Sequence, residues 1–170
     1  MRNFLCCLLI AVCLFSEQAT AQRVIVKPNR TDAVVAVITD EAIAATHSFL
    51  AYCNMLSARE SLGVYAVAAT WKDPDQVKET LMDIRKNYPA LEGMVLIGDV
   101  PVAMVRNAQH MTTAFKMDEI KFDRKQSSVA SDRFYDDPDL QFRFIGQDKD
   151  NPLWFYYELD ERSPQRIQSE

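Results

Sequence analysis

Three short apolar runs, separated by segments with helical signals, constrain the fold of this chain more than any other feature. The runs are residues 34–39, 64–70 and 94–98, and none of them contains a charged residue. Such runs are typical of strands buried on both faces of a parallel sheet. The third run ends in Gly98 and Asp99, and Pro101 cannot continue a ladder of hydrogen bonds. We therefore expect a fully buried strand at 94–98, with its carboxyl end at the edge where open α/β sheets bind ligands.

The segments between these runs predict two helices. Asp40 is placed to cap a helix that continues without Gly or Pro to Leu62, with Gly63 at its C-terminal end. Asp73 caps a second helix, over residues 74–88, which Pro74 begins. The alternation of strand and helix predicts an α/β fold, with a mostly parallel sheet flanked by helices.

The rest of the chain adds strands at both ends of this unit. Residues 22–29 predict a short lead-in edge strand, and residues 140–144 and 153–159 alternate as the two strands of a C-terminal β-hairpin. Residues 107–125 are polar and predict a solvated loop or a short helix. The turn after the first strand, at residues 39–41, is acidic and lacks glycine, which argues against a Rossmann-type nucleotide site.

The amino terminus has the pattern of a secretory signal peptide. Arg2 precedes an apolar run at residues 4–15, and residues 19–21 supply small side chains at a cleavage site, so we expect cleavage after Ala21. The apolar run is shorter than the ~20 residues of a membrane-spanning helix. A lipoprotein signal is the alternative, but Cys13 follows Val12 rather than a small residue. We divide the chain into a signal peptide (1–21), a lead-in segment (22–33) and an α/β domain (34–170).

Charge and cysteine content limit the function classes. The net charge is −5 and no run of Lys or Arg is present, which argues against binding a nucleic-acid backbone. Removal of the signal peptide leaves Cys53 as the sole cysteine, so the mature chain has no internal disulfide to form. An exported α/β protein without disulfides is typical of a bacterial envelope or secreted protein.

Two segments carry a resemblance to a known family. Residues 95–101 (VLIGDVP) form an apolar strand that ends in Gly-Asp, and residues 131–137 (SDRFYDD) follow about thirty residues later. In this order and at this separation, they resemble the gingipain-like cysteine peptidases. The resemblance implies a caspase-like fold, here incomplete, and places this chain at the amino-terminal portion of such a domain.

The same resemblance implies which catalytic groups to expect. The family cleaves peptides with a His–Cys pair that follows later strands, downstream of a Gly-Arg strand, and the chain ends before these elements. We therefore assign no catalytic residue and expect no peptidase activity from the isolated chain. His47 and Cys53 are poorly placed to replace the pair, because a six-residue step along a helix turns about 600° and points them to different faces. Cys53 is expected in the core, and His110 in a polar loop.

Acidic residues and one tyrosine are the remaining site candidates. Asp99, Asp132 and Tyr135 are expected near the ligand-binding edge, although a turn or capping role for Asp99 is the stronger interpretation. Asp136, Asp137 and Asp139 concentrate oxygen ligands that suit calcium, with a solvated acidic turn as the alternative. No other cofactor is expected.

Two functions remain open at this point. The chain is either the front part of a gingipain-like cysteine endopeptidase domain, or a non-catalytic α/β domain of the envelope that binds a peptide or partner. Its expected partners are accordingly the downstream half of the domain, or another protein or peptide. No transmembrane segment is expected after cleavage of the signal.

Overall fold

The computed structural model describes residues 21–106, 120–160 and 162–163. The predicted signal peptide lies outside this range except for Ala21, and so do His110 and most of the predicted loop at 107–125. Within the described residues, no helix is long and apolar enough to cross a bilayer.

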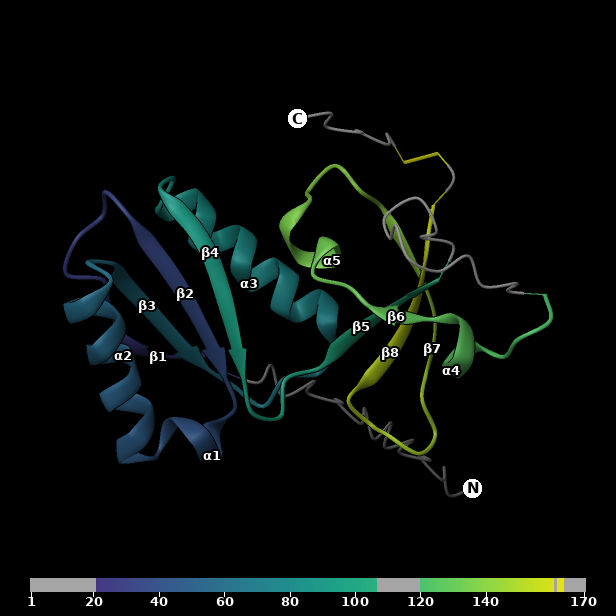
Figure 1. Cartoon of the computed structure of the whole chain (residues 1–170), viewed down its shortest axis with the longest axis horizontal. Helices are drawn as coiled ribbons and strands as arrows, with labels where there is room; N and C mark the ends of the chain where they lie inside the picture. The colour runs from purple at the N-terminus through teal and green to yellow at the C-terminus, as the bar shows by residue number, and fades with distance from the viewer. Residues whose placement is uncertain (1–20, 107–119, 161, 164–170) are drawn as a thin grey trace, which may run out of the picture.

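The first half of the chain forms a four-stranded sheet, as the alternation of strand and helix predicts. Its strands are β1 (Arg23–Val26), β2 (Val34–Thr39), β3 (Gly63–Ala68) and β4 (Leu91–Ile97), and its helices are α1 (Glu41–Ala44), α2 (His47–Arg59) and α3 (Pro74–Asn87). The strand order is β1-β3-β2-β4, in which β3, β2 and β4 run parallel and β1 pairs antiparallel with β3 (Figure 1).

The second half of the chain forms a separate four-stranded sheet. Its strands are β5 (Val102–Arg106), β6 (Val129–Ala130), β7 (Phe142–Gln147) and β8 (Trp154–Leu159), in the order β6-β5-β8-β7, with the short helices α4 (Arg124–Ser127) and α5 (Arg133–Asp136). β5 and β8 run parallel, whereas β7 pairs antiparallel with β8. The described chain is therefore a mixed α/β fold with two mixed sheets.

Helix α3 lies between the two sheets and shares one core with both (Figure 1). Its buried side chains Val77, Leu81 and Ile84 belong to a cluster that includes residues of β2 and β8. A second cluster on the opposite face of the first sheet joins α2 to β2 and β3, and Cys53 lies inside it with 1% of its surface exposed. The prediction of a core cysteine is confirmed.

A buried hydroxyl group fixes the second sheet to the start of α3. The Tyr157 hydroxyl donates to the Asp75 carboxylate over 2.6 Å, although 82 residues separate the two in the chain. Tyr157 is 1% exposed, and burial raises the pKa of its phenol. This hydrogen bond and the shared apolar cluster hold the two sheets as one body.

The expectation that the third strand is buried on both faces is wrong. β4 lies at the edge of the first sheet, with Glu92 and Gly93 exposed and residues 94–97 only half-buried. The reason is topological, because after Pro101 the chain enters the second sheet instead of supplying a neighbour for β4. The apolar composition of β4 thus does not correspond to full burial within the described residues.

The predicted first helix is interrupted at Thr46. The Thr46 hydroxyl donates to the Ile43 carbonyl, which ends α1, and accepts the Phe49 N–H, which caps α2. Threonine competes with helical backbone bonds in this way because its hydroxyl lies close to the main chain. Gly63 does not end the second helix either: Ser61 adopts the left-handed conformation there (φ 56°), and Gly63 begins β3.

Gly63 is required by close packing, and this generates a test against a matched glycine. A Cβ atom at Gly63 would lie 2.1 Å from the Arg30 carbonyl oxygen, whereas one at Gly93 would meet nothing within 4 Å. We expect Gly63→Ala to lower the free energy of unfolding by about 1–3 kcal/mol through overpacking. Gly93→Ala is the control and should change it by less than about 1 kcal/mol. Equal effects in urea denaturation would contradict this account.

Candidate functional site

The candidate site lies where β2 and β4 end side by side. Thr39 and Ile97 are paired at the carboxyl ends of these parallel strands. From β2 the chain passes to α1 and α2 on one face, and it reaches β4 from α3 on the other face. The gap between two neighbouring strands whose helices lie on opposite faces is where open α/β sheets bind ligands.

Asp40 occupies this gap with its own carboxylate. One oxygen accepts the Ile43 N–H (2.9 Å) and caps α1, and the other accepts the Asp99 N–H (2.8 Å) across the gap. Burial alone would raise the pKa of the Asp40 carboxyl, but the N–H groups of Ile43 and Asp99 keep that pKa below its ordinary value. Asp40 therefore holds the end of β4 against the start of α1 as an anion.

Gly98 makes this contact sterically feasible. It has a φ of +86°, and a Cβ atom built on it would lie 1.9 Å from the nearer oxygen of Asp40. A side chain at this position would be strained and would also displace the Asp40 carboxylate. Two further hydrogen bonds fix the strand ends: the Thr39 hydroxyl donates to the Ile97 carbonyl (2.9 Å), and the Trp71 indole N–H donates to the Thr39 carbonyl (2.7 Å).

Asp99 is exposed at this edge. Its backbone N–H is used by Asp40, but none of the hydrogen bonds and ion pairs found in the described part of the chain involves its carboxylate. The Asp99 side chain thus makes neither the cap nor the turn hydrogen bond considered for it, whereas the helix cap predicted at Asp40 is confirmed. The Asp99 carboxylate is thus available to contact a cation or an N–H group brought to this edge.

The structure brings the two segments of the resemblance together. The Tyr135 hydroxyl donates to the Pro101 carbonyl (2.9 Å), and the Ser131 N–H donates to the Ala103 carbonyl (3.1 Å). Tyr135 is 2% exposed, and burial raises the pKa of its phenol, so it supports the turn after β4 rather than facing a ligand. Asp132 directly precedes α5 and is exposed.

The aspartates predicted to bind calcium do not form a metal site. Among the described residues, no three His, Cys, Asp or Glu side chains are grouped so that they could hold a metal ion. The Asp137 carboxylate pairs with Arg133 (3.0 Å) and accepts the Asp139 N–H (3.1 Å). Asp136 and Asp139 are exposed. The alternative interpretation, a solvated acidic turn, fits this geometry.

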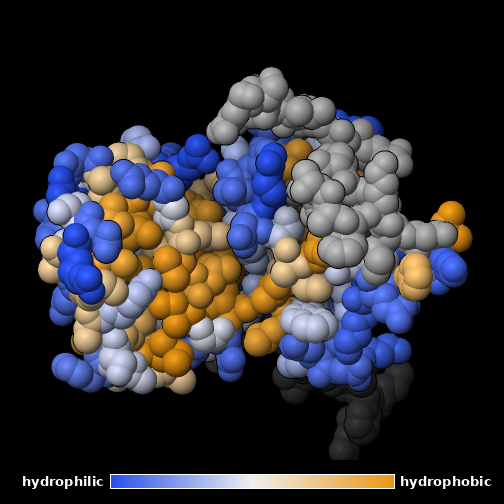
Figure 2. Space-filling model, in the orientation of Figure 1, coloured by the Kyte–Doolittle hydropathy of each residue, from blue (hydrophilic) through white to orange (hydrophobic). Residues whose placement is uncertain are grey.

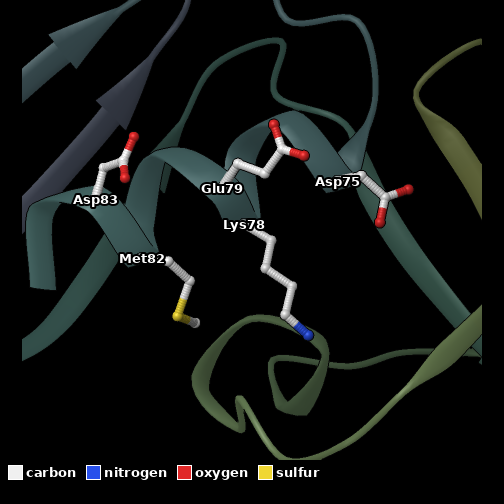
Figure 3. A pocket seen from close by; sticks show the side chains of 5 residues that line it. All are labelled: Asp75, Lys78, Glu79, Met82 and Asp83. Carbon is white, nitrogen blue, oxygen red and sulfur yellow. The ribbon is translucent and has the colours of Figure 1, made fainter. Parts of the chain in front are cut away.

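A hollow along α3 was missed by sequence reasoning. It has a volume of about 470 Å³ and is lined by Asp75, Lys78, Glu79, Met82 and Asp83. Figure 3 shows the Lys78 amine turned away from Glu79 and toward the loop that carries α5. There it lies 5.1 Å from the ring centre of Phe134 and 5.4 Å from that of Phe142.

Lys78 joins α3 to α5 electrostatically. Burial lowers the pKa of its ammonium group, and the carboxylates of Asp75, Asp137 and Asp136 oppose that shift. An ammonium ion over two aromatic rings and near three carboxylates stabilises the contact between the helices. The signal in the sequence was the position of Lys78 directly after the buried Val77, which places it on the flank of the buried face.

The residues that could imitate a His–Cys pair lie apart. Cys53 is buried, and burial raises the pKa of its thiol, which disfavours the thiolate needed for attack. His47 begins α2 and is exposed. The prediction that these two side chains lie on different faces is confirmed.

Comparison with known proteins gives no match: the chain matches no protein-family model, no curated protein and no solved structure. The resemblance to the gingipain-like peptidases therefore stays a prediction.

The contact between Asp40 and Asp99 predicts a specific pH dependence. The folded-state pKa of Asp40 lies below the unfolded value of about 3.9, so its stabilisation is complete above that pH and is lost as the pH falls through the folded pKa. We expect Asp40→Asn to cost about 1–2 kcal/mol in urea denaturation at neutral pH. The difference in unfolding free energy between Asp40→Asn and wild type should narrow as the pH falls through the folded-state pKa of Asp40, where the wild-type carboxyl also becomes neutral.

Asp99→Asn is the matched control for this experiment. It removes a neighbouring exposed carboxylate but keeps the backbone N–H that donates to Asp40. Its unfolding free energy should follow that of wild type at every pH. If the difference in unfolding free energy between Asp40→Asn and wild type stayed constant on acidification, the charge of Asp40 would not be what holds this edge.

Proposed function

We propose that this chain is exported and forms the amino-terminal scaffold of a gingipain-like cysteine endopeptidase domain. In this proposal the chain supplies the parallel strands and the hydrogen-bonded turn at their carboxyl ends. The nucleophilic cysteine and its histidine come from a further segment that pairs with β4. Cleavage of the signal peptide after Ala21 delivers the protein to the envelope or the medium.

The observation that carries the proposal is the open edge of β4 beside the candidate site. β2 pairs with one edge of β4, and no strand among the described residues pairs with the other. Figure 2 shows apolar surface over the part of the first sheet that contains β2 and β4. A hollow of about 200 Å³ also borders β4, between Met94, Met82 of α3 and Tyr135 of α5.

The other edge of the same sheet is protected in ways that β4 is not. β1 has four residues and an arginine, Arg23, paired with Glu41. Short length and charge are usual means of blocking an edge, whereas a register shift occurs at both edges of this sheet. β4 has seven residues, and its last four, 94–97, carry no charge. The contrast supports β4 as the edge that receives another strand.

The two resemblance segments supply the second support. The turn after β4 is held by two hydrogen bonds, one from the Tyr135 hydroxyl to the Pro101 carbonyl and one from the Asp99 N–H to the Asp40 carboxylate, so its geometry does not depend on a bound ligand. A rigid turn at the carboxyl end of a strand is a suitable base for catalytic groups carried by a neighbouring strand. Asp99, exposed on that turn, would face such groups.

The peptidase proposal is tested by reading the coding sequence through and beyond the Glu170 codon and expressing the continuing frame. We expect a Gly-Arg strand, a histidine beside a glycine and a later cysteine, and we expect the extended protein to hydrolyse casein. Replacing the later cysteine with alanine should abolish hydrolysis, whereas Cys53→Ser should leave it unchanged because Cys53 is buried in the core. A stop codon directly after Glu170 would refute the proposal.

A second candidate function rests on the same edge. An extended peptide can add to an exposed sheet edge through main-chain hydrogen bonds, with side-chain pockets giving specificity. The hollow beside Met94 is placed to take one such side chain. In this alternative, the chain is a non-catalytic domain that binds a peptide or a partner protein in the envelope.

The open edge also predicts how the mature chain, from Gln22 onward, behaves in solution. Because an unprotected apolar edge pairs with other chains, we expect its mass in sedimentation velocity to rise with concentration. Val95→Lys in β4 should restore the monomer, whereas Val24→Lys in β1 should not. A wild-type monomer with one cooperative thermal transition would instead favour the second candidate function.

A further inference from the structure

Gln22 has an unusual position if the signal peptide is removed as proposed. It would be the first residue of the mature chain, one residue before β1 begins at Arg23. Gln22 is exposed, and its side-chain amide donates to the Thr80 hydroxyl of α3 over 2.7 Å. Thr80 in turn donates to the Gln76 carbonyl over 2.8 Å and is 5% exposed. The side chain of this terminal glutamine is thus held against the body of the protein.

We propose that Gln22 is a modification site at which the mature chain closes to an amino-terminal pyroglutamate. The free α-amino nitrogen attacks the side-chain amide carbon, a new nitrogen–carbon bond forms, and the bond from that carbon to the amide nitrogen breaks. The amide nitrogen leaves as ammonia, with a proton from the attacking amine. No oxidant, reductant or other reactant is consumed. The product is a five-membered lactam without the charge of the terminus.

The structure also indicates what limits the rate of this ring closure. Nε2 of Gln22 is both the group that donates to Thr80 and the group that leaves as ammonia. The docked side chain must therefore give up its bond to Thr80 before the ring closes, and the pool of undocked side chains sets the rate. Closure in turn removes the donor, so the amino-terminal end is released from α3. This inference rests on the proposed export and cleavage after Ala21.

The test uses the full chain, expressed with its leader in an exporting bacterium and purified from the periplasm. The amino-terminal peptide is measured by mass spectrometry directly after purification and during incubation at neutral pH. We expect a peptide that begins at residue 22 and is lighter by one ammonia. Thr80→Val should speed its appearance by roughly 2- to 10-fold, the factor that corresponds to the loss of one hydrogen bond.

Two control variants complete the design. Ser57→Ala removes a half-buried hydroxyl that is hydrogen-bonded to Asn29, and it should leave the rate unchanged. Gln22→Glu keeps the shape of the side chain and should form the ring far more slowly, with loss of water instead of ammonia. Equal rates of ring closure in wild type and Thr80→Val would refute the idea that the hydrogen bond to Thr80 slows the reaction.

The outcomes separate this inference from the proposed export. A peptide that begins at residue 22 and keeps an open glutamine throughout incubation would refute pyroglutamate formation and leave the export proposal intact. A peptide that begins at Met1, or at any other residue, would refute cleavage after Ala21, and with it the premise of this inference.

Discussion

The packing of α3 between two sheets is the constraint on which the rest of the structure depends. The helix buries Val77, Leu81 and Ile84 in a cluster that spans both sheets, and the Asp75 carboxylate at its start accepts the Tyr157 hydroxyl. Lys78 then ties the flank of the helix to α5. Because α5 supplies Tyr135 to the turn after β4, the position of that turn is linked to α3 through one continuous set of contacts.

Local sequence signals were sufficient to predict the elements of the first sheet. The apolar run at 34–39 coincides with β2, and Asp73 with Pro74 begins α3 as predicted, with the Asp73 carboxylate accepting the Gln76 N–H. Both signals act over a few residues, so they can be seen without knowing the fold. The break at Thr46 depends on one hydroxyl that bonds in two directions, and a helical pattern without Gly or Pro does not reveal it.

Pairing between distant segments was not predictable from such signals. β5 joins β8 in parallel, with Val102 opposite Trp154, and this pairing carries the chain into a second sheet. Because the chain continues into the second sheet, β4 lies at an edge of the first. The strand was predicted correctly, but the prediction of its full burial was wrong. Apolar composition indicates that a segment has a partner surface, but the topology decides whether that surface is present.

At the candidate site, too, local features were predictable from the sequence and long-range contacts were not. Asp99 was identifiable because it follows a strand, whereas the contact from Asp40 joins residues 59 apart in the chain and appears only in the folded structure. Tyr135 was expected at a ligand edge, but its hydroxyl bonds the Pro101 carbonyl in the interior. Both differences come from long-range hydrogen bonds, which fix the turn after β4 before any ligand or partner arrives.

The direction of β4 limits what the open edge can do. A strand added in parallel would end beside Gly98 and Asp99, and the residues after it would lie at the same edge as the exposed Asp99 carboxylate. An added antiparallel strand would instead bring its first residues there. Since β2, β3 and β4 already run parallel, a parallel addition continues the pattern of the sheet. Under the peptidase proposal, this is the arrangement that would place the proposed catalytic groups next to the turn held by Asp40 and Tyr135.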